Sequence, residues 1–274
     1  MPKIKIASFN VNSVKARLPA LLAWLKTSNP DIVCLQELKC VEQEFPFSAL
    51  FDAGYNAIVS GQKSYNGVAI LSKFKMEDVV KKLPLLDEVS DEQARYIEAV
   101  IPLHGTAIRV ASIYVPNGGG EILPNQKLEE TEKFNYKLRF FDRLNTHLKN
   151  ILTYDEVAIF GGDYNVSVEE IDVYDAKSWE GQVCFNALER QKFRSILNLG
   201  LIDSYRAKNQ ESQAFSWWDY RGGSWQHNKG LRIDYLLASP LAADKILDAT
   251  IEDKGVRDQE KASDHCPVCV EIEI

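Results

Sequence analysis

The chain has 274 residues, of which 45% are hydrophobic and 26% are charged, a composition typical of a soluble globular protein with one large domain or two small ones. Its net charge of −7 argues against a protein that coats nucleic acid by charge alone, but it allows a nuclease whose carboxylates hold a cation. No apolar run is long enough to cross a membrane, and the N-terminus shows no signal-peptide pattern. We therefore expect a cytoplasmic protein.

The first half of the chain predicts strands interrupted by one clear helix. Residues 3–9 alternate between apolar and polar side chains, as a strand does, and leucines recur at helical spacing between Val14 and Lys26. Short apolar runs bounded by turn residues predict further strands over residues 31–37, 55–59, 67–72, 95–102 and 106–115. Several of these strands must pair antiparallel, because the connections are too short for helical crossovers.

The second half predicts two amphipathic helices among further strands. The helices are expected over about 132–150 and 186–199, and the strands over 157–160, 215–220, 231–238 and 268–274. Roughly a dozen short strands are too many for one open parallel sheet, so two packed sheets flanked by helices fit better. Without repeats or linker-like segments, the simplest prediction is a single domain over residues 1–274.

The five cysteines predict no disulfide framework and no zinc site. They are Cys34, Cys40, Cys184, Cys266 and Cys269, an odd number in a chain long enough to fold without disulfides. Cys266 and Cys269 are three apart on an expected strand, where their side chains face opposite sides, and no second pair completes a zinc site. We expect all five to be reduced.

The run VAIFGGDYNV, residues 157–166, is the most informative stretch. An apolar strand ends at two glycines that are expected to let the backbone turn, and Asp163 and Asn165 follow. If the extended geometry persists, these two side chains project to the same side. A carboxylate beside an amide suits attack by water on a phosphate ester, although a plain polar turn would have the same letters.

Other polar residues follow the predicted strands. Each one alone could cap a helix or satisfy a turn. Together they supply hard oxygen ligands for Mg²⁺, a histidine and a phenol, the parts of a metal-assisted phosphoryl-transfer site. The set is Asn10, Glu37, Tyr114, Asp163, Asn165, Asp234, Asp264 and His265.

Six ordered blocks of this sequence resemble the exonuclease III family of abasic-site endonucleases. They are SFNVNS (8–13), LQELK (35–39), YVPNG (114–118), GGDYNV (161–166), GLRIDYLLAS (230–239) and SDHCPV (263–268). The resemblance runs from residue 8 to the last strand, and it implies a four-layer α/β sandwich with two mixed sheets inside, helices outside and the site at one end of the sheets.

The resemblance also implies a metal site. Glu37 would be the principal ligand of Mg²⁺, for which Mn²⁺ could substitute, with Asn10 and Asp264 in or near its coordination shell. Asp163 and Asn165 would be the ligands of a second metal ion if the site holds one. The number of metal ions stays open at this point.

Catalytic roles follow from the same resemblance. Asp163 would orient or deprotonate the attacking water, and Asn165 and His265 would hold the scissile phosphate. Tyr114 would contact the phosphate or assist the leaving oxygen, and Asp234 would fix His265 by a hydrogen bond. Whether Asp163 or the metal activates the water stays open.

Residues 215–234 combine three tryptophans, a tyrosine and two arginines, which suits stacking on a sugar or base while cations meet the backbone. By resemblance, Trp217 and Leu231 would line a pocket for an abasic sugar, with Tyr220 and Arg221 beside it. Trp218 is expected in the core. Three further cations, Arg95, Lys133 and Lys137, are expected either to contact DNA phosphates or to be solvated surface charges.

The function predicted is a monomeric, Mg²⁺-dependent DNA repair phosphodiesterase that incises duplex DNA 5′ to abasic sites and trims 3′ ends. Gly118 to Gly120 carry no arginine where certain abasic-site endonucleases place one, so a 3′–5′ exonuclease with little abasic-site activity is the first alternative. The others are a phosphoesterase of the same fold that acts on lipid or inositol phosphates, and a DNA-binding protein without catalysis.

Overall fold

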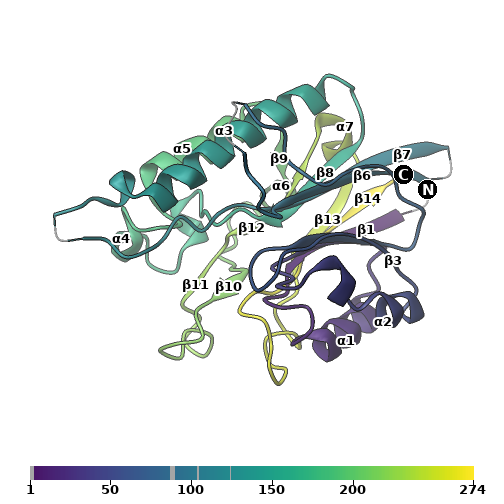
Figure 1. Ribbon diagram of the computed structural model, residues 1–274, viewed down its shortest axis with the longest axis horizontal. Coiled ribbons are helices and arrows are strands. Elements are labelled where there is room, and N and C mark those ends of the chain that lie inside the picture. Colours follow the sequence, from purple (N-terminus) through teal and green to yellow (C-terminus); the bar gives the residue numbers. More distant parts are fainter. Residues whose placement is uncertain (1–2, 87–89, 104, 124) are drawn as a thin grey trace.

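The computed structural model describes residues 3–86, 90–103, 105–123 and 125–274. Two six-stranded mixed sheets pack face to face, and helices cover the outer face of each (Figure 1). This arrangement confirms the four-layer α/β sandwich.

The first sheet has the strand order β13-β14-β1-β2-β4-β3. β1 and β2 are parallel, and the other neighbours are antiparallel. Its strands are β1 (Lys3–Asn10), β2 (Ile32–Gln36), β3 (Asn56–Ser60), β4 (Val68–Ser72), β13 (Ile246–Ile251) and β14 (Val268–Glu273). Because β1 lies between β2 and β14, the two ends of the chain meet in one sheet.

The second sheet has the strand order β5-β6-β7-β8-β12-β9. Here β7 and β8 form the parallel pair, so each sheet carries one parallel pair near its centre. Its strands are β5 (Glu77–Val80), β6 (Tyr96–Leu103), β7 (Thr106–Tyr114), β8 (Ala158–Asp163), β9 (Ile202–Asp203) and β12 (Asp234–Ala238). A separate two-stranded ribbon pairs β10 (Trp217–Trp218) with β11 (Gly230–Leu231).

Two groups of helices cover the sheets. The α-helices are α1 (Leu18–Ser28), α2 (Phe47–Asp52), α3 (Glu132–Leu152), α4 (Ala176–Trp179), α5 (Ala187–Leu197), α6 (Ser204–Lys208) and α7 (Pro240–Ala243). Short 3-10 turns lie at η1 (Glu42–Glu44), η2 (Leu128–Glu130) and η3 (Glu170–Asp172). Among the described residues no helix is both long enough and apolar enough to cross a membrane.

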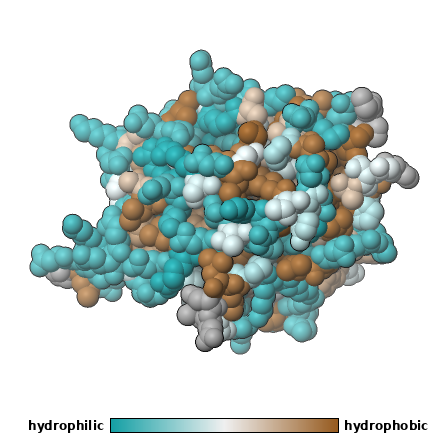
Figure 2. Space-filling view, turned by 90° about the horizontal axis from the view of Figure 1, so that it is seen from above, coloured by the Kyte–Doolittle hydropathy of each residue, from teal (hydrophilic) through white to brown (hydrophobic). Residues whose placement is uncertain are grey.

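Three apolar cores separate the four layers. The central core joins the inner faces of the two sheets through residues such as Ile6 and Ile159. A second core packs α3 and α5 on the second sheet, with Phe141 and Phe193 at its centre. The third packs α1 on the first sheet around Trp24. Hydrophilic side chains cover much of the outer face over α3 and α5, as expected for amphipathic helices (Figure 2).

Several boundaries differ from those expected. The first helix begins at Leu18 rather than Val14, because Pro19 fits only the first turn of a helix. The strand expected over 215–220 is reduced to two residues, and that over 231–238 is interrupted between β11 and β12. The short or exposed strands β5, β9 and β13 were not predicted. All five cysteines are buried and free, as expected.

Candidate active site

The carboxyl ends of the two parallel pairs meet at one end of the sandwich. β1 ends at Asn10, which is paired in register with Gln36, so Glu37 follows immediately beyond β2. In the other sheet Tyr114 is paired with Asp163, and Asp163 is also paired with Asp234 of β12. The pairing of the strands therefore brings together side chains that are far apart in the sequence.

The double glycine acts differently from the expectation. Gly161 and Gly162 lie inside β8 rather than in a turn. A Cβ on Gly162 would lie 2.2 Å from the carbonyl oxygen of Ile113, so the missing side chain allows β8 to approach β7 closely. The strand then ends at Asp163, and Asn165 adopts a left-handed φ of 51°. The expectation that both side chains share one side of an extended segment was therefore wrong, although both line the same cavity.

A hydrogen-bonded set joins the two sheets at this point. The Nδ2 of Asn10 donates to Glu37 Oε1 at 3.1 Å and to Asp163 Oδ2 at 2.9 Å. The phenol of Tyr114 donates to Glu37 Oε1 at 2.7 Å. Lys39, which sequence reasoning did not single out, lies with its Nζ 2.8 Å from Glu37 Oε2. Glu37 is therefore held from three sides.

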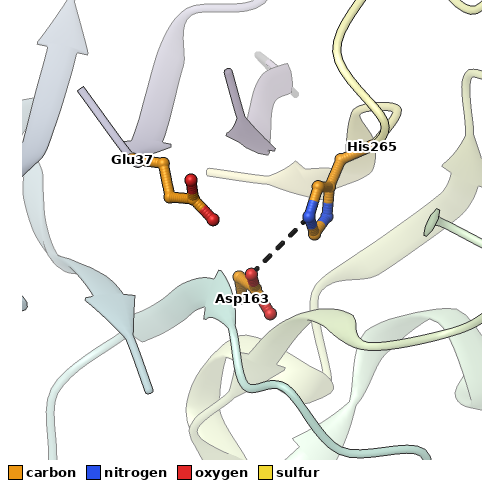
Figure 3. Close-up of side chains that lie close together, drawn as sticks. All are labelled: Glu37, Asp163 and His265. Atoms are coloured by element: carbon orange, nitrogen blue, oxygen red, sulfur yellow. Dashed lines mark ion pairs between the residues drawn. The ribbon is translucent and has the colours of Figure 1, made fainter. Parts of the chain in front are cut away.

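His265 lies between two aspartates. Its Nδ1 is 2.8 Å from Asp234 Oδ2. Its Nε2 is 3.7 Å from Asp163 Oδ2, and this is the ion pair drawn in Figure 3. The Ser216 hydroxyl, also missed from the sequence, donates to the same Asp234 oxygen at 2.6 Å. One ligand atom each from Glu37, Asp163 and His265 lie within 4.8 Å of one another. The predicted contact between Asp234 and His265 is thus present.

Burial and charge set the protonation of the carboxylates differently. Burial alone would raise the pKa of Glu37, but Lys39 and the Asn10 amide hold that pKa below its usual value. The cation nearest to Asp163 is His265, at 3.7 Å, and burial raises the pKa of Asp163 to about 7 against the opposing effect of that cation. Glu37 is therefore the permanent anion of the site, whereas Asp163 can exchange a proton near neutral pH.

His265 and Tyr114 keep their protons. Burial would lower the pKa of His265, but Asp234 and Asp163 raise that pKa to about 10. Burial raises the pKa of the Tyr114 phenol well above its usual value, and the charge of Glu37 adds to the effect. An imidazolium has no free lone pair for a metal, so His265 suits an anion, and the oxygens of Glu37 and Asp163 suit a hard cation.

Asn165 is fixed by the loop that follows β7. Its Oδ1 accepts a hydrogen bond from Asn117 Nδ2 at 2.9 Å, and its Nδ2 donates to the carbonyl of Val115 at 2.9 Å. Asn117 was not singled out from the sequence. Lys137, expected to contact DNA or to lie on the surface, has a fully buried side chain that forms an ion pair with Glu189. Both interpretations of Lys137 were wrong, because α3 turns this residue inward.

Asp264 lies at the rim of the site. Its Oδ1 accepts from Asn12 Nδ2 at 2.9 Å, and its Oδ2 accepts from Trp217 Nε1 at 3.0 Å. Its side chain lines the same cavity as Glu37 and Asp163. Asp264 therefore connects the acidic cluster to the apolar wall of the cavity.

The cavity above the cluster has a volume of about 440 Å³ and one apolar wall. Trp217 and Leu231 face one another across the two-stranded ribbon and form part of this wall. Trp179 of α4 and Val183, which were not predicted, complete it. Trp218 is buried in the core, as expected. The site thus combines an acidic end with an aromatic wall.

The predicted cations lie in the cavity or next to it. Arg95 lies over the Tyr114 ring, 4.7 Å from the ring centroid, and donates to the Tyr114 carbonyl. Lys133 lines a neighbouring hollow that shares Asn117 with the cavity. Arg221 lines the cavity itself but pairs with Asp219 at 2.7 Å. Tyr220, expected beside the pocket, lines a different hollow together with Arg17, where it is half exposed and accepts a hydrogen bond from Arg17.

Comparison with known proteins agrees with this geometry. Residues 7–265 match the model of the Endonuclease/Exonuclease/phosphatase family. Exodeoxyribonuclease III of Haemophilus influenzae is 32% identical over 98% of this chain and its own full length. The DNA-(apurinic or apyrimidinic site) endonuclease of Dictyostelium discoideum is 28% identical over 99% of this chain and 71% of its own.

Two solved structures superpose over nearly the whole chain. The 3′ phosphatase NExo of Neisseria, bound to a product DNA hairpin, has a TM-score of 0.90 and 36% identity, over 99% of this chain and 100% of its own. An AP endonuclease from Archaeoglobus fulgidus has a TM-score of 0.88 and 35% identity over the same shares.

Proposed function

Because the chain belongs to the endonuclease/exonuclease/phosphatase family, we propose that it is a metal-dependent DNA repair hydrolase of the exonuclease III type. It would incise duplex DNA 5′ to abasic sites and trim 3′ ends as an exonuclease and 3′-phosphatase. One observation carries this proposal above the others. The buried carboxylate of Asp163 lies within reach of the Glu37 carboxylate and the His265 ring, in a cavity that also has an aromatic wall.

The donor set fits a hard divalent cation, which we propose to be Mg²⁺, with Mn²⁺ as a substitute. Glu37 offers a carboxylate that stays ionised, and Asp163 brings a second oxygen within reach. The amide oxygen of Asn10 and the carboxylate of Asp264 lie beside them, already bonded to Asn12. When bound, the cation would neutralise charge on the phosphoryl oxygens and make a bound water more acidic.

The protein groups then divide the remaining work. Asp163 would accept the proton of the attacking water, since the Asn10 amide fixes its Oδ2 and the backbone N–H of Asn165 fixes its Oδ1 beside Glu37. His265, kept charged by Asp234, would stabilise the negative charge that grows on the phosphoryl oxygens. Asp163 has to accept a proton while His265 keeps its own, which requires the pKa of His265 to be higher than that of Asp163, as it is.

Tyr114 and Asn165 would position the phosphate. The Tyr114 phenol stays neutral and can donate a hydrogen bond to the phosphate or to the leaving oxygen. The Asn165 amide oxygen is already bonded to Asn117, so we favour a single cation centred on Glu37 over a second cation held by Asn165.

The cavity supports DNA as the substrate. An abasic sugar turned out of a duplex would find an apolar wall at Trp217 and Leu231. Arg221, Arg95 and Lys133 lie where the flanking phosphates of a duplex could be met. A small lipid or inositol phosphate would leave this wall unused.

We also propose one catalytic domain that acts as a cytoplasmic monomer. The pairing of β1 with both β2 and β14 supports one domain, since neither end of the chain can leave without breaking a sheet. Light scattering that shows a stable dimer would contradict the monomer.

The test uses one duplex, 5′-labelled, with a central abasic-site analogue and one recessed 3′ end, incubated with Mg²⁺ and then with EDTA. We expect a single cut at the analogue and shortening from the recessed end, both lost in EDTA. A 3′ ladder without the cut would make the protein an exonuclease with little abasic-site activity. No cleavage with either Mg²⁺ or Mn²⁺ would overturn the proposal.

A further inference from the structure

A buried ion pair lies next to two residues that line the cavity, Asn117 and Asn165. Lys137 of α3 and Glu189 of α5 have side chains with 0% exposure, and their charged groups are in contact. Replacing a buried ion pair by apolar residues often leaves a protein as stable or more stable. Stability alone therefore does not explain why Lys137 and Glu189 are present here. The other bonds of Lys137 supply one.

The ammonium group of Lys137 joins two loops that carry site residues. Its Nζ donates to the carbonyl oxygen of Asn165 at 2.6 Å and to that of Asn117 at 3.0 Å. With Glu189 as the third acceptor, all three N–H groups of the lysine are used. The lysine therefore fixes the loop after β7 and the loop after β8 relative to one another.

These two loops need such a tie. Asn165 has a left-handed φ of 51°, which asparagine tolerates, so the position of this turn is set by the hydrogen bonds that its backbone and side chain make. The Asn117 side chain holds the Asn165 amide from one side, and the Lys137 ammonium holds its peptide carbonyl from the other. The lysine stem also packs on Gly118, where an added Cβ would lie 2.8 Å from Lys137 Cδ.

Glu189 fixes the lysine in turn. Its Oε1 accepts the backbone N–H of Asn186 at 2.8 Å, which closes the capping box of α5. Its other oxygen receives Lys137. The helix that follows the cavity wall at Cys184 is thereby connected to the same ammonium group.

From this geometry we propose that Lys137 is a positioning residue for phosphodiester hydrolysis, which holds the Asn117 and Asn165 loops in the arrangement that reaction needs. The inference rests on the function proposed above. The Lys137 side chain is fully buried and cannot contact the substrate, so it acts only through Asn117 and Asn165.

The experiment compares four proteins by steady-state cleavage of the abasic-site duplex and by thermal unfolding. They are the wild type, Glu189→Gln, the double variant Lys137→Met with Glu189→Gln, and Lys192→Met. The last is a matched control, because Lys192 pairs with Asp142 and so joins the same two helices without touching either loop.

We expect the double variant to lose at least about tenfold in kcat with KM nearly unchanged, because methionine fills the space of the lysine stem but donates to neither carbonyl. Lys192→Met should keep kcat within about threefold, and Glu189→Gln, whose amide oxygen can still accept from Lys137, should lose less kcat than the double variant. The loss in the double variant should persist at temperatures where thermal unfolding shows that it is fully folded.

Three outcomes would overturn the inference. The double variant could retain the kcat of the wild type, its loss of kcat could follow its loss of folded protein, or it could fail to fold at all. Failure of the proposed function looks different, because then the wild type itself would not cleave the duplex in Mg²⁺ or Mn²⁺.

Discussion

Two buried aspartates nine positions apart show how one fold separates chemistry from stability. Asp163 is 1% exposed at the end of β8, and Asp172 is 0% exposed in the turn η3. Burial tends to raise the pKa of both carboxyls. Yet the pKa of Asp163 is raised to about 7, whereas that of Asp172 is held below its usual value.

The partners explain the difference. Asp172 accepts hydrogen bonds from Arg232 at 2.8 Å and from Arg206, and the guanidinium groups more than offset the cost of burial. Asp163 accepts from the neutral Asn10 amide, while its nearest cation, His265, stays 3.7 Å away. A fully paired carboxylate is fixed in one protonation state, and an incompletely paired one is free to exchange its proton.

The substitution Asp163→Asn should have the largest effect on activity. An amide cannot accept the proton of the attacking water, so we expect cleavage of the abasic-site duplex to fall at least about thousandfold. The melting temperature should stay equal or rise, because burial disfavours the charged form of Asp163, as its raised pKa shows, and a neutral amide avoids that cost. Steady-state assays and calorimetry in EDTA measure the two effects. Full activity in this variant would remove Asp163 from the proposed mechanism.

Asp172→Asn should have the opposite profile. It removes one of the two carboxylates that pair with the buried Arg232 guanidinium and leaves only Asp203, and breaking such a buried pair costs about 3 kcal/mol of the free energy of unfolding. Urea denaturation measures this loss. The kcat of the molecules that remain folded should stay near that of the wild type. If kcat fell as far as in Asp163→Asn, the two aspartates would not be separable.

The sequence predicts the position of Asp163 but not that of Asp172. Asp163 follows an apolar strand within a recognisable block, and the structure places it beside Glu37 and His265 as expected. Asp172 lies among ordinary loop letters, Asn117 lies inside the block YVPNG without being singled out, and Lys137 was given the wrong role, because the partners of all three are distant in the sequence. Charge type predicts exposure for a lysine such as Lys137, and only the packing of α3 against α5 shows that it is buried.

The strands also differ in how far the local sequence predicts them. Long apolar strands such as β1 and β8 were predicted because their pattern is local. The exposed strand β5 and the two-residue β9 were missed because only their neighbours in the sheet make them strands. The pairing of parallel strands, which brings Asn10 to Glu37 and Tyr114 to Asp163, is likewise a property of the whole fold.

The substitution Arg206→Met tests how much each of the two arginines contributes to holding Asp172. Arg206→Met removes one charged hydrogen bond from Asp172 but leaves Arg232 in place, with its own bond to Asp203 at 2.7 Å. We expect a loss of about 1.5 kcal/mol in the free energy of unfolding, half of that for Asp172→Asn. A loss as large as that of Asp172→Asn would mean that Arg206, rather than Arg232, is the main partner.

The smallest expected effect is the acid dependence of the same pair. Because the pKa of Asp172 is lower in the folded protein than the usual value of about 3.9, its stabilisation is complete above that value and is lost as the pH falls through the folded pKa. The free energy of unfolding of the wild type should therefore fall more steeply below about pH 4 than that of Asp172→Asn. Other carboxylates with lowered pKa values, such as Glu252 and Asp91, titrate in both proteins and cancel in the difference. Urea denaturation at pH 5 and at pH 3 measures it. Parallel acid profiles would show that the guanidinium groups do not hold Asp172 in its charged form, and the contrast with Asp163 would then rest on geometry alone.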